Sequence, residues 1–133
     1  MDSLDTKIVQ ELRKNARTPF LQIAKKLDVS EGTVRKRVGK LVEGGVIKRF
    51  TLELANENNA IIEISTNPNI ATEKISAEIK GIGIDRIFEV AGRFEILCFV
   101  KAKSLQETNE IVEKIRAIKG VTHTETFPVL REG

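Results

Sequence analysis

The 133-residue sequence predicts an α+β protein with two parts, a helical N-terminal third and a C-terminal region in which strands and helices alternate. Apolar residues recur at helical spacing up to about residue 45, whereas residues 60–133 switch repeatedly between strand and helix spacing. Charge divides at the same place, because residues 1–50 carry 12 Lys and Arg against 6 Asp and Glu, and the remainder carries 10 against 13. We therefore expect a cationic head joined to an acidic second unit.

Two helices are expected at the start of the chain. The first is expected to be capped by Ser3 or Asp5, to run to about residue 15 or 16, and to have a structural role, because its pattern is amphipathic. The second follows Thr18-Pro19, where threonine caps the helix and proline takes the first position, at which a missing N–H costs nothing. The small Ala24 inside this second helix would let a neighbouring helix approach closely.

The stretch Ser30–Gly45 predicts a third helix, opened by Ser30 and closed by the pair Gly44-Gly45. One side of this helix is cationic, and such a surface favours a polyanion as partner. Only residues 28–30 separate it from the second helix, and so tight a turn is typical of a helix-turn-helix motif, whose recognition helix lies in the major groove of double-stranded DNA. The opposite side of the helix is an apolar stripe that is expected to pack against the core: Val34, Val38, Leu41 and Val42.

The residues expected to contact DNA lie on this third helix or at the starts of the two helices. Arginine commonly reads guanine, glutamate accepts from cytosine, and threonine suits a base edge or a thymine methyl. Gly39 either marks a close approach of the backbone to the partner or is a tolerated defect that costs up to ~1 kcal/mol. The candidates are Glu31, Gly32, Thr33, Lys36 and Arg37 for bases, Arg35 and Lys40 for phosphates, and Thr18 and Ser30 at the helix starts.

Residues Val46–Leu54 alternate apolar and polar side chains over most of their length, which predicts a linker strand. A turn-rich stretch containing Asn56, Asn58 and Asn59 follows. The expected domains are a helix-turn-helix domain over residues 1–50, a linker strand and turn over 51–59, and a second domain over 60–133.

The C-terminal region predicts the order β-α-β-β-α-β, which is that of a ferredoxin-like fold. Glu107, three residues after Ser104, completes a capping box at the start of the second helix of this region. Pro128 indicates a strand end or a strand at the edge of the sheet. Strands are expected over residues 60–66, 85–91, 94–103 and 121–129, and helices over 72–80 and from Ser104 to Gly120.

Both faces of the strand at residues 94–100 are apolar, although two helices can cover only one face of the sheet. Ile96 and Cys98 point to one side, and Leu97 and Phe99 point to the other. A second copy of the chain is the obvious cover for the second face, so we expect at least a homodimer packed sheet against sheet.

Several other functions are disfavoured. His123 is the only histidine and has no cysteine or second histidine beside it, and no phosphate-binding glycine motif is present, so we expect no enzyme, metal or cofactor. Cys98 is expected to be a buried hydrophobe. RNA stacking is a poor fit, because strand parity spreads Phe88, Phe94 and Phe99 over two faces. Since no run is long enough to span a membrane, we expect a cytoplasmic protein.

The sequence resembles the Lrp/AsnC family, also called leucine-responsive or feast/famine regulators, over nearly its whole length. The likeness rests on Leu4-Asp5-x-x-Ile8, on Ile23-Ala24-Lys25-Lys26-Leu27 with Val29-Ser30 and Arg37-Val38, on Leu41-x-x-x-Gly45-Val46-Ile47, on Val90-Ala91-Gly92-Arg93-Phe94-Glu95, and on Gly120-Val121-x-x-Thr124-x-Thr126.

This resemblance implies that the linker strand pairs between subunits, that dimers assemble into tetramers or octamers, and that an amino-acid effector binds between dimers. It assigns the effector to Gly92, Arg93, Phe94, Glu95, Thr124 and Thr126. The chain departs from the family pattern Gly-Asp-aromatic-Asp at Arg93, where a cation replaces an acid. Arginine would repel an ammonium group and could pair with a carboxylate.

The leading hypothesis is a sequence-specific DNA-binding transcriptional regulator that acts as a dimer or larger assembly, modulated by an amino-acid-type effector. The alternative is an architectural protein that compacts DNA with little sequence preference. A metabolite-sensing module without DNA function is hard to reconcile with the cationic head.

Overall fold

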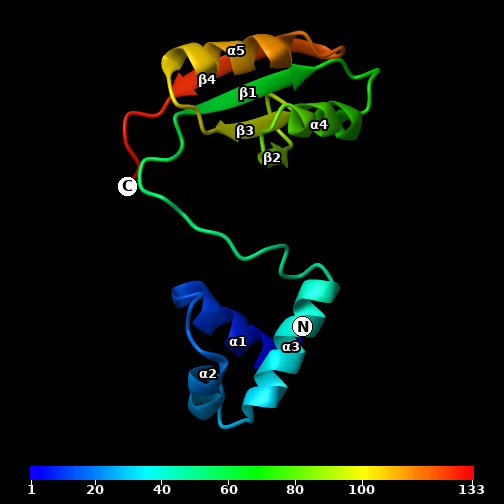
Figure 1. The fold of residues 1–133 in the computed structure, drawn as a ribbon. Coiled ribbons are helices and arrows are strands. Elements are labelled where there is room, and N and C mark those ends of the chain that lie inside the picture. Colours follow the sequence, from blue (N-terminus) through cyan, green and yellow to red (C-terminus); the bar gives the residue numbers. More distant parts are fainter. The chain divides into compact units, whose positions relative to one another are not determined.

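The computed structural model describes all 133 residues, which divide into two compact units, Met1–Leu52 and Glu53–Gly133. The first unit contains three helices, and the second contains a four-stranded sheet with two helices (Figure 1). Each unit has a hydrophobic core of its own. The predicted α+β class and the order of the helices and β-sheet strands are confirmed.

The helices of the first unit are α1 (Ser3–Lys14), α2 (Phe20–Leu27) and α3 (Glu31–Glu43). Their apolar stripes meet in one core, in which Ile8, Ile23 and Val34 are fully buried. Burying an aliphatic side chain of this size contributes roughly 1.5–3 kcal/mol each. The helical spacing of the sequence therefore identified the faces that hold the head together.

The first two helices begin differently from the sequence prediction. Asp2, rather than Ser3 or Asp5, caps α1: the Asp5 N–H donates to the Asp2 carboxylate at 2.9 Å, and the Asp2 N–H donates back at 3.3 Å. This reciprocal pair satisfies two backbone donors at once. Pro19 occupies the cap position of α2, while the Thr18 hydroxyl donates to the carbonyl of Asn15 at 2.8 Å.

The turn between α2 and α3 has the length that the sequence predicted. Asp28 ends α2 in the left-handed region at φ 56°, which reverses the chain within three residues. Ser30 then caps α3, because its hydroxyl accepts from the Thr33 N–H at 3.1 Å. At the other end, α3 stops at Glu43, and Gly45 adopts φ 74°, a conformation that glycine tolerates best. The helix-turn-helix motif is thus formed.

Residues 46–54 form no strand, so the prediction of a linker strand is wrong. The apolar side chains of the alternating pattern are not packed within the chain: Val46, Phe50, Leu52 and Leu54 are all more than half exposed. A strand requires ladder hydrogen bonds to a neighbour, and the four strands of the sheet pair with one another instead. The sequence pattern shows a segment with an apolar side but does not supply its partner.

The second unit has antiparallel strands in the order β2-β3-β1-β4, which matches the predicted ferredoxin-like arrangement. Pro128 lies at the end of an edge strand, where a missing N–H is tolerated. Two strands are shorter than expected, because residues 90–95 turn the chain between them. The elements are β1 (Ala60–Thr66), α4 (Thr72–Gly81), β2 (Arg86–Glu89), β3 (Ile96–Val100), α5 (Leu105–Arg116) and β4 (Val121–Pro128).

Both helices pack on one face of this sheet and enclose its core. Ile96 and Cys98 of β3 point into that core, while Leu97 and Phe99 point to the other side and are only half-buried. We call the side without helices the open face. By strand register it carries Ile61, Glu63, Ser65, Arg86, Phe88, Leu97, Phe99, His123, Glu125 and Phe127.

The aromatic side chains gather on the open face more than the sequence predicted. The sequence predicted that Phe88, Phe94 and Phe99 are spread over two faces. The β2–β3 register places both Phe88 and Phe99 on the open face, with ring centroids 5.9 Å apart in an edge-to-face arrangement. Phe94 precedes β3 and belongs to the turn. The open face is therefore strongly apolar at its β2–β3 side.

Candidate nucleic-acid interface and effector site

The exposed side of α3 carries cations that are not paired within the chain. Val34, Val38 and Leu41 bury one stripe of the helix, so the opposite side faces outward. Lys36 and Lys40 are exposed there, and neither ammonium group has a carboxylate within ion-pair distance. Two lysines without ion-pair partners on a recognition helix are suited to phosphate or base-edge contacts.

Arg35 and Glu31 form an ion pair on one flank of this side. Arg35 Nη2 lies 2.7 Å from Glu31 Oε1, one helical turn away, and its guanidinium lies 5.8 Å from the ring centroid of Phe20. Exposed pairs of this kind contribute little to stability. Both side chains could therefore exchange this contact for DNA at small cost.

Arg37 lies on the other flank and is held by α1. Its guanidinium pairs with Asp2 and, at 3.3 Å, with Asp5, the two residues of the α1 capping box. These carboxylates raise the pKa of Arg37, and the pKa of Asp2 is lowered first by the Asp5 N–H and then by Arg37. The structure thus places Arg37 against α1, apart from the exposed lysines.

The remaining predicted DNA contacts lie around the start of α3. Gly32 is exposed, and the hydroxyls of Ser30 and Thr33 are 2.8 Å apart, so both are engaged in the cap. Thr18 is half-buried at the other end of α2.

The sequence candidates omitted Lys25, which is exposed on α2 without an ion-pair partner, whereas the neighbouring Lys26 contacts Glu11 at 2.8 Å. In a helix-turn-helix domain the helix preceding the recognition helix crosses the DNA backbone, which makes Lys25 a candidate phosphate contact. The sequence could have identified Lys25, because the helical spacing of α2 already placed it on the outward side.

The predicted effector residues are only partly brought together. Arg93 and Phe94, in the turn between β2 and β3, line a hollow of about 160 Å³ on the open face. Thr124 and Thr126 are not in it, because their register opposite Ile64 and Ile62 turns them toward the helix-covered side. The other lining residues, which sequence reasoning missed, are Glu63, Ser65, His123 and Glu125.

Glu95 has a structural position within this loop. Its carboxylate accepts from the Thr66 N–H at 2.7 Å and lies 3.3 Å from the Thr66 hydroxyl, while its own N–H donates to the carbonyl of Ile64. These contacts tie the loop to the end of β1. Gly92 is exposed at the tip, so Arg93 and Phe94 are the loop residues presented to a ligand.

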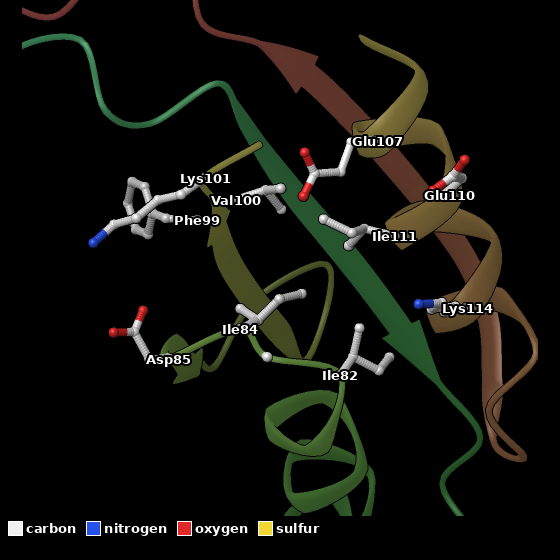
Figure 2. Close-up of a pocket in the computed structure, with 11 residues that line it drawn as sticks. Ile82, Ile84, Asp85, Phe99, Val100, Lys101, Glu107, Glu110, Ile111 and Lys114 are labelled. Carbon is white, nitrogen blue, oxygen red and sulfur yellow. The ribbon is translucent and has the colours of Figure 1, made fainter. Parts of the chain in front are cut away.

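A second hollow, of about 240 Å³, lies between α5, the end of β3 and the segment that joins α4 to β2 (Figure 2). Ile82, Ile84 and Ile111 form its apolar part, and Glu110 and Lys114 stand on α5 at its rim. None of the predicted site residues lines it.

The structure offers little for covalent or metal chemistry. Burial raises the pKa of Cys98 to about 12, which keeps it a protonated thiol. No group of three or more His, Cys, Asp or Glu side chains is gathered closely enough to hold a metal ion. Among the helices, none combines the length and apolar composition that crossing a bilayer requires.

Family models match both units of the chain. A model of winged helix-turn-helix DNA-binding domains matches residues 1–48, and a model of the Lrp/AsnC ligand binding domain matches residues 59–132. The chain belongs to the Lrp/AsnC family. It is therefore a transcriptional regulator that joins a helix-turn-helix DNA-binding domain to an Lrp/AsnC ligand-binding domain.

Curated relatives of this Lrp/AsnC protein extend over nearly the same length. The HTH-type transcriptional regulator LysM of Sulfurisphaera tokodaii is 46% identical over 134 residues, covering 98% of this chain and 96% of that protein. LysM of Saccharolobus solfataricus is 42% identical, with 98% and 94% covered. Both alignments include the head and the sheet together.

Among solved structures, a feast or famine regulatory protein from M. tuberculosis complexed with L-methionine has the same fold. Its TM-score is 0.82 at 20% identity, over 98% of this Lrp/AsnC chain and 92% of that chain. At this identity the likeness concerns the fold alone.

Proposed function

We propose that this protein is a sequence-specific regulator that reads DNA through α3, acts as a homodimer or larger assembly, and responds to an amino-acid-type effector. The observation that carries the proposal is the exposed side of α3, where Lys36 and Lys40 stand unpaired directly after the tight turn. We place enzymatic activity outside its function and expect it to work in the cytoplasm.

In this proposal α3 enters the major groove and its first turns face the base edges. Gly32, Thr33 and Lys36 are the residues we assign to bases, with Arg35 and Lys40 on the phosphates. Lys25 adds a phosphate contact from α2. Arg37 supports the placement of α3 against α1 rather than reading a base.

Two copies are needed for affinity, because one short helix makes few contacts. The open face, whose Phe88 and Phe127 are 43% and 42% exposed, is the surface we assign to dimerisation. We further propose that residues 51–59 link the two domains and that dimers assemble into tetramers or octamers. The apolar alternation of residues 46–54 would then be satisfied by another subunit.

The effector is proposed to bind at the loop that presents Arg93 and Phe94. The M. tuberculosis relative was solved with L-methionine, so an amino acid is a reasonable class of ligand. Arg93 would pair with the carboxylate, and Glu63 or Glu125 would receive the ammonium group. Arg93→Asp is expected to abolish or alter the response to each amino acid, measured as a change in DNA affinity; unchanged responses would contradict this pocket.

Footprinting of bound genomic fragments at rising salt separates this function from architectural DNA compaction. Non-specific binding depends on counterion release and is screened away, whereas a specific complex keeps its base contacts. We expect bounded footprints that persist as general binding is lost. Uniform protection that vanishes along the whole fragment at one salt concentration would favour the architectural function.

A further inference from the structure

The last residues before β1 are tied to two other segments of the second unit. The Asn59 N–H donates to the carbonyl of Val100 at 2.8 Å, and the Val129 N–H donates to the carbonyl of Asn59 at 2.8 Å. The Glu57 carboxylate lies 3.2 Å from Lys101 Nζ, just after β3. The end of the linker is therefore fixed to the end of β3 and to the segment that follows β4.

Asn58 lies between these two residues and is held by Glu132, which follows β4 in the chain. The Asn58 N–H donates to Glu132 Oε1 at 3.1 Å, and the side-chain Nδ2 donates to the same oxygen at 2.8 Å. Both bonds are partly buried, and bonds to an ionised carboxylate are roughly twice as strong as neutral ones. One carboxylate oxygen thus fixes both the backbone and the side chain of Asn58.

This arrangement has a cost in stability. The Asn58 side-chain oxygen, Oδ1, is buried and has no hydrogen-bond partner. A buried acceptor without a partner is unfavourable, and such a group in a folded protein calls for an explanation other than stability. The position of Asn58, at the point where the linker meets the second unit, provides one.

The other end of the linker is attached to the first unit. Ile47 packs against the core of that unit, and its N–H donates to the carbonyl of Leu41 at 3.0 Å. Between the two attachments, the side chains of Phe50 and Leu52 are more than half exposed. The direction in which the chain leaves the second unit is therefore set at Asn58.

We propose that Glu132 is a positioning residue for paired DNA reading, because it fixes the end of the linker and so restricts where each head can reach. With Asn58 held, the entropy of ordering it is lost during folding rather than on binding DNA. Ordering one free residue on binding would lower the affinity about tenfold. A fixed linker end also favours one half-site spacing over others. The inference rests on the proposed function, in which two heads read DNA together.

Substitution of Glu132 tests this role when binding to two DNA probes is compared. The probes are a duplex that spans one bounded genomic footprint and a duplex that carries half of it. Glu132→Ala in the full chain should lower the affinity for the whole footprint about tenfold and leave the affinity for the half footprint unchanged. Glu132→Gln keeps an acceptor oxygen and should stay within about threefold of the wild-type affinity. Inserting two base pairs at the centre of the footprint should weaken binding of the wild-type chain more than that of Glu132→Ala.

Hydrogen exchange of the Asn58 amide reports directly on the contact, and it should be at least ~tenfold faster in Glu132→Ala than in the wild-type chain. Leu130→Ala is the matched control from the same segment, because Leu130 is 97% exposed, and it should leave exchange and both affinities unchanged. Sedimentation should give the same dimer dissociation constant for every variant. Circular dichroism checks folding, and the Gln variant remains informative if the Ala variant is unfolded.

Several results would overturn the positioning role alone. These are unchanged Asn58 exchange in Glu132→Ala, faster exchange with unchanged affinity for the whole footprint, an equal loss of affinity on both probes, a changed dimer dissociation constant, or a Gln variant as weak as the Ala variant. A wild-type chain that binds the whole footprint no more tightly than half of it would instead overturn the proposed paired reading itself.

Discussion

The exposed side of α3 and the open face of the sheet are both surfaces without a partner in the chain, yet their chemistry is opposite. On α3 the unpaired groups are Lys36 and Lys40, and the apolar side of the helix is already buried in the core of its own unit. On the sheet they are aromatic and aliphatic side chains with two acids at one side. The first surface suits a polyanion and the second suits another protein surface.

The largest effect is expected from breaking the open face. Leu97→Asp would place an unpaired charge in the centre of the proposed interface, at a cost of about 3–5 kcal/mol. This corresponds to a roughly 10²–10⁴-fold rise in the dimer dissociation constant. Sedimentation should then show a 14.8 kDa species, and the affinity for a two-half-site DNA should fall with it.

Leu105→Asp is the matched control for this change, because Leu105 is 71% exposed at the start of α5, on the helix side of the sheet. It should leave both dimerisation and DNA affinity unaltered. A Leu97→Asp chain that sediments as the wild-type protein does would remove the open face as the interface.

A smaller effect is expected at α3, where two substitutions distinguish a cation that contacts DNA from one that stabilises the helical domain. Lys40→Ala should weaken binding at low salt and flatten the slope of log K against log salt by ~0.9, the value for one phosphate contact. Arg37→Ala should leave that slope unchanged while lowering the thermal midpoint of the head, because its partners are Asp2 and Asp5. Equal slope changes in both variants would return Arg37 to the DNA interface.

The capping box of α1 predicts a pH effect of modest size. The pKa of Asp2 lies below its usual value of 3.8, chiefly because its carboxylate accepts from the Asp5 N–H and secondly because of Arg37. A lowered pKa means that stability is present above the usual value and is lost as pH falls below it. Thermal unfolding between pH 5 and pH 2.5 should show this loss, and Arg37→Ala should reduce it without abolishing it.

The smallest effect is expected at Gly39, which is exposed on α3 with open space around its Cα. Gly39→Ala should stabilise the head by up to ~1 kcal/mol, since alanine favours the helix. If DNA affinity falls while stability rises, the glycine serves a close approach to DNA. Unaltered affinity would make it a tolerated defect.

Sequence periodicity was sufficient for the helices, the strand order and the tight turn, because each follows from burying an apolar stripe or face. It also identified Lys36 and Lys40, whose outward position is fixed by the buried side of α3. Family resemblance supplied the loop at residues 92–95, which no spacing rule would have selected.

What the sequence did not give depends on contacts between distant residues. The pairing of Arg37 with Asp2 and Asp5 joins positions more than 30 residues apart. The register between β1 and β4 decides that His123 and Glu125, rather than Thr124 and Thr126, share a face with Arg93. Residues 46–54 lacked a strand partner, which alternation alone cannot reveal.

The central claim is that two α3 helices read DNA together because the open faces join two chains. It is tested by measuring affinity for two half-sites set one helical turn apart and for the same half-sites with about five further base pairs between them, which rotates one to the opposite side of the duplex. The account predicts a large loss of affinity for the longer spacing and its recovery when a full turn is inserted. Equal affinity at all three spacings would contradict paired reading.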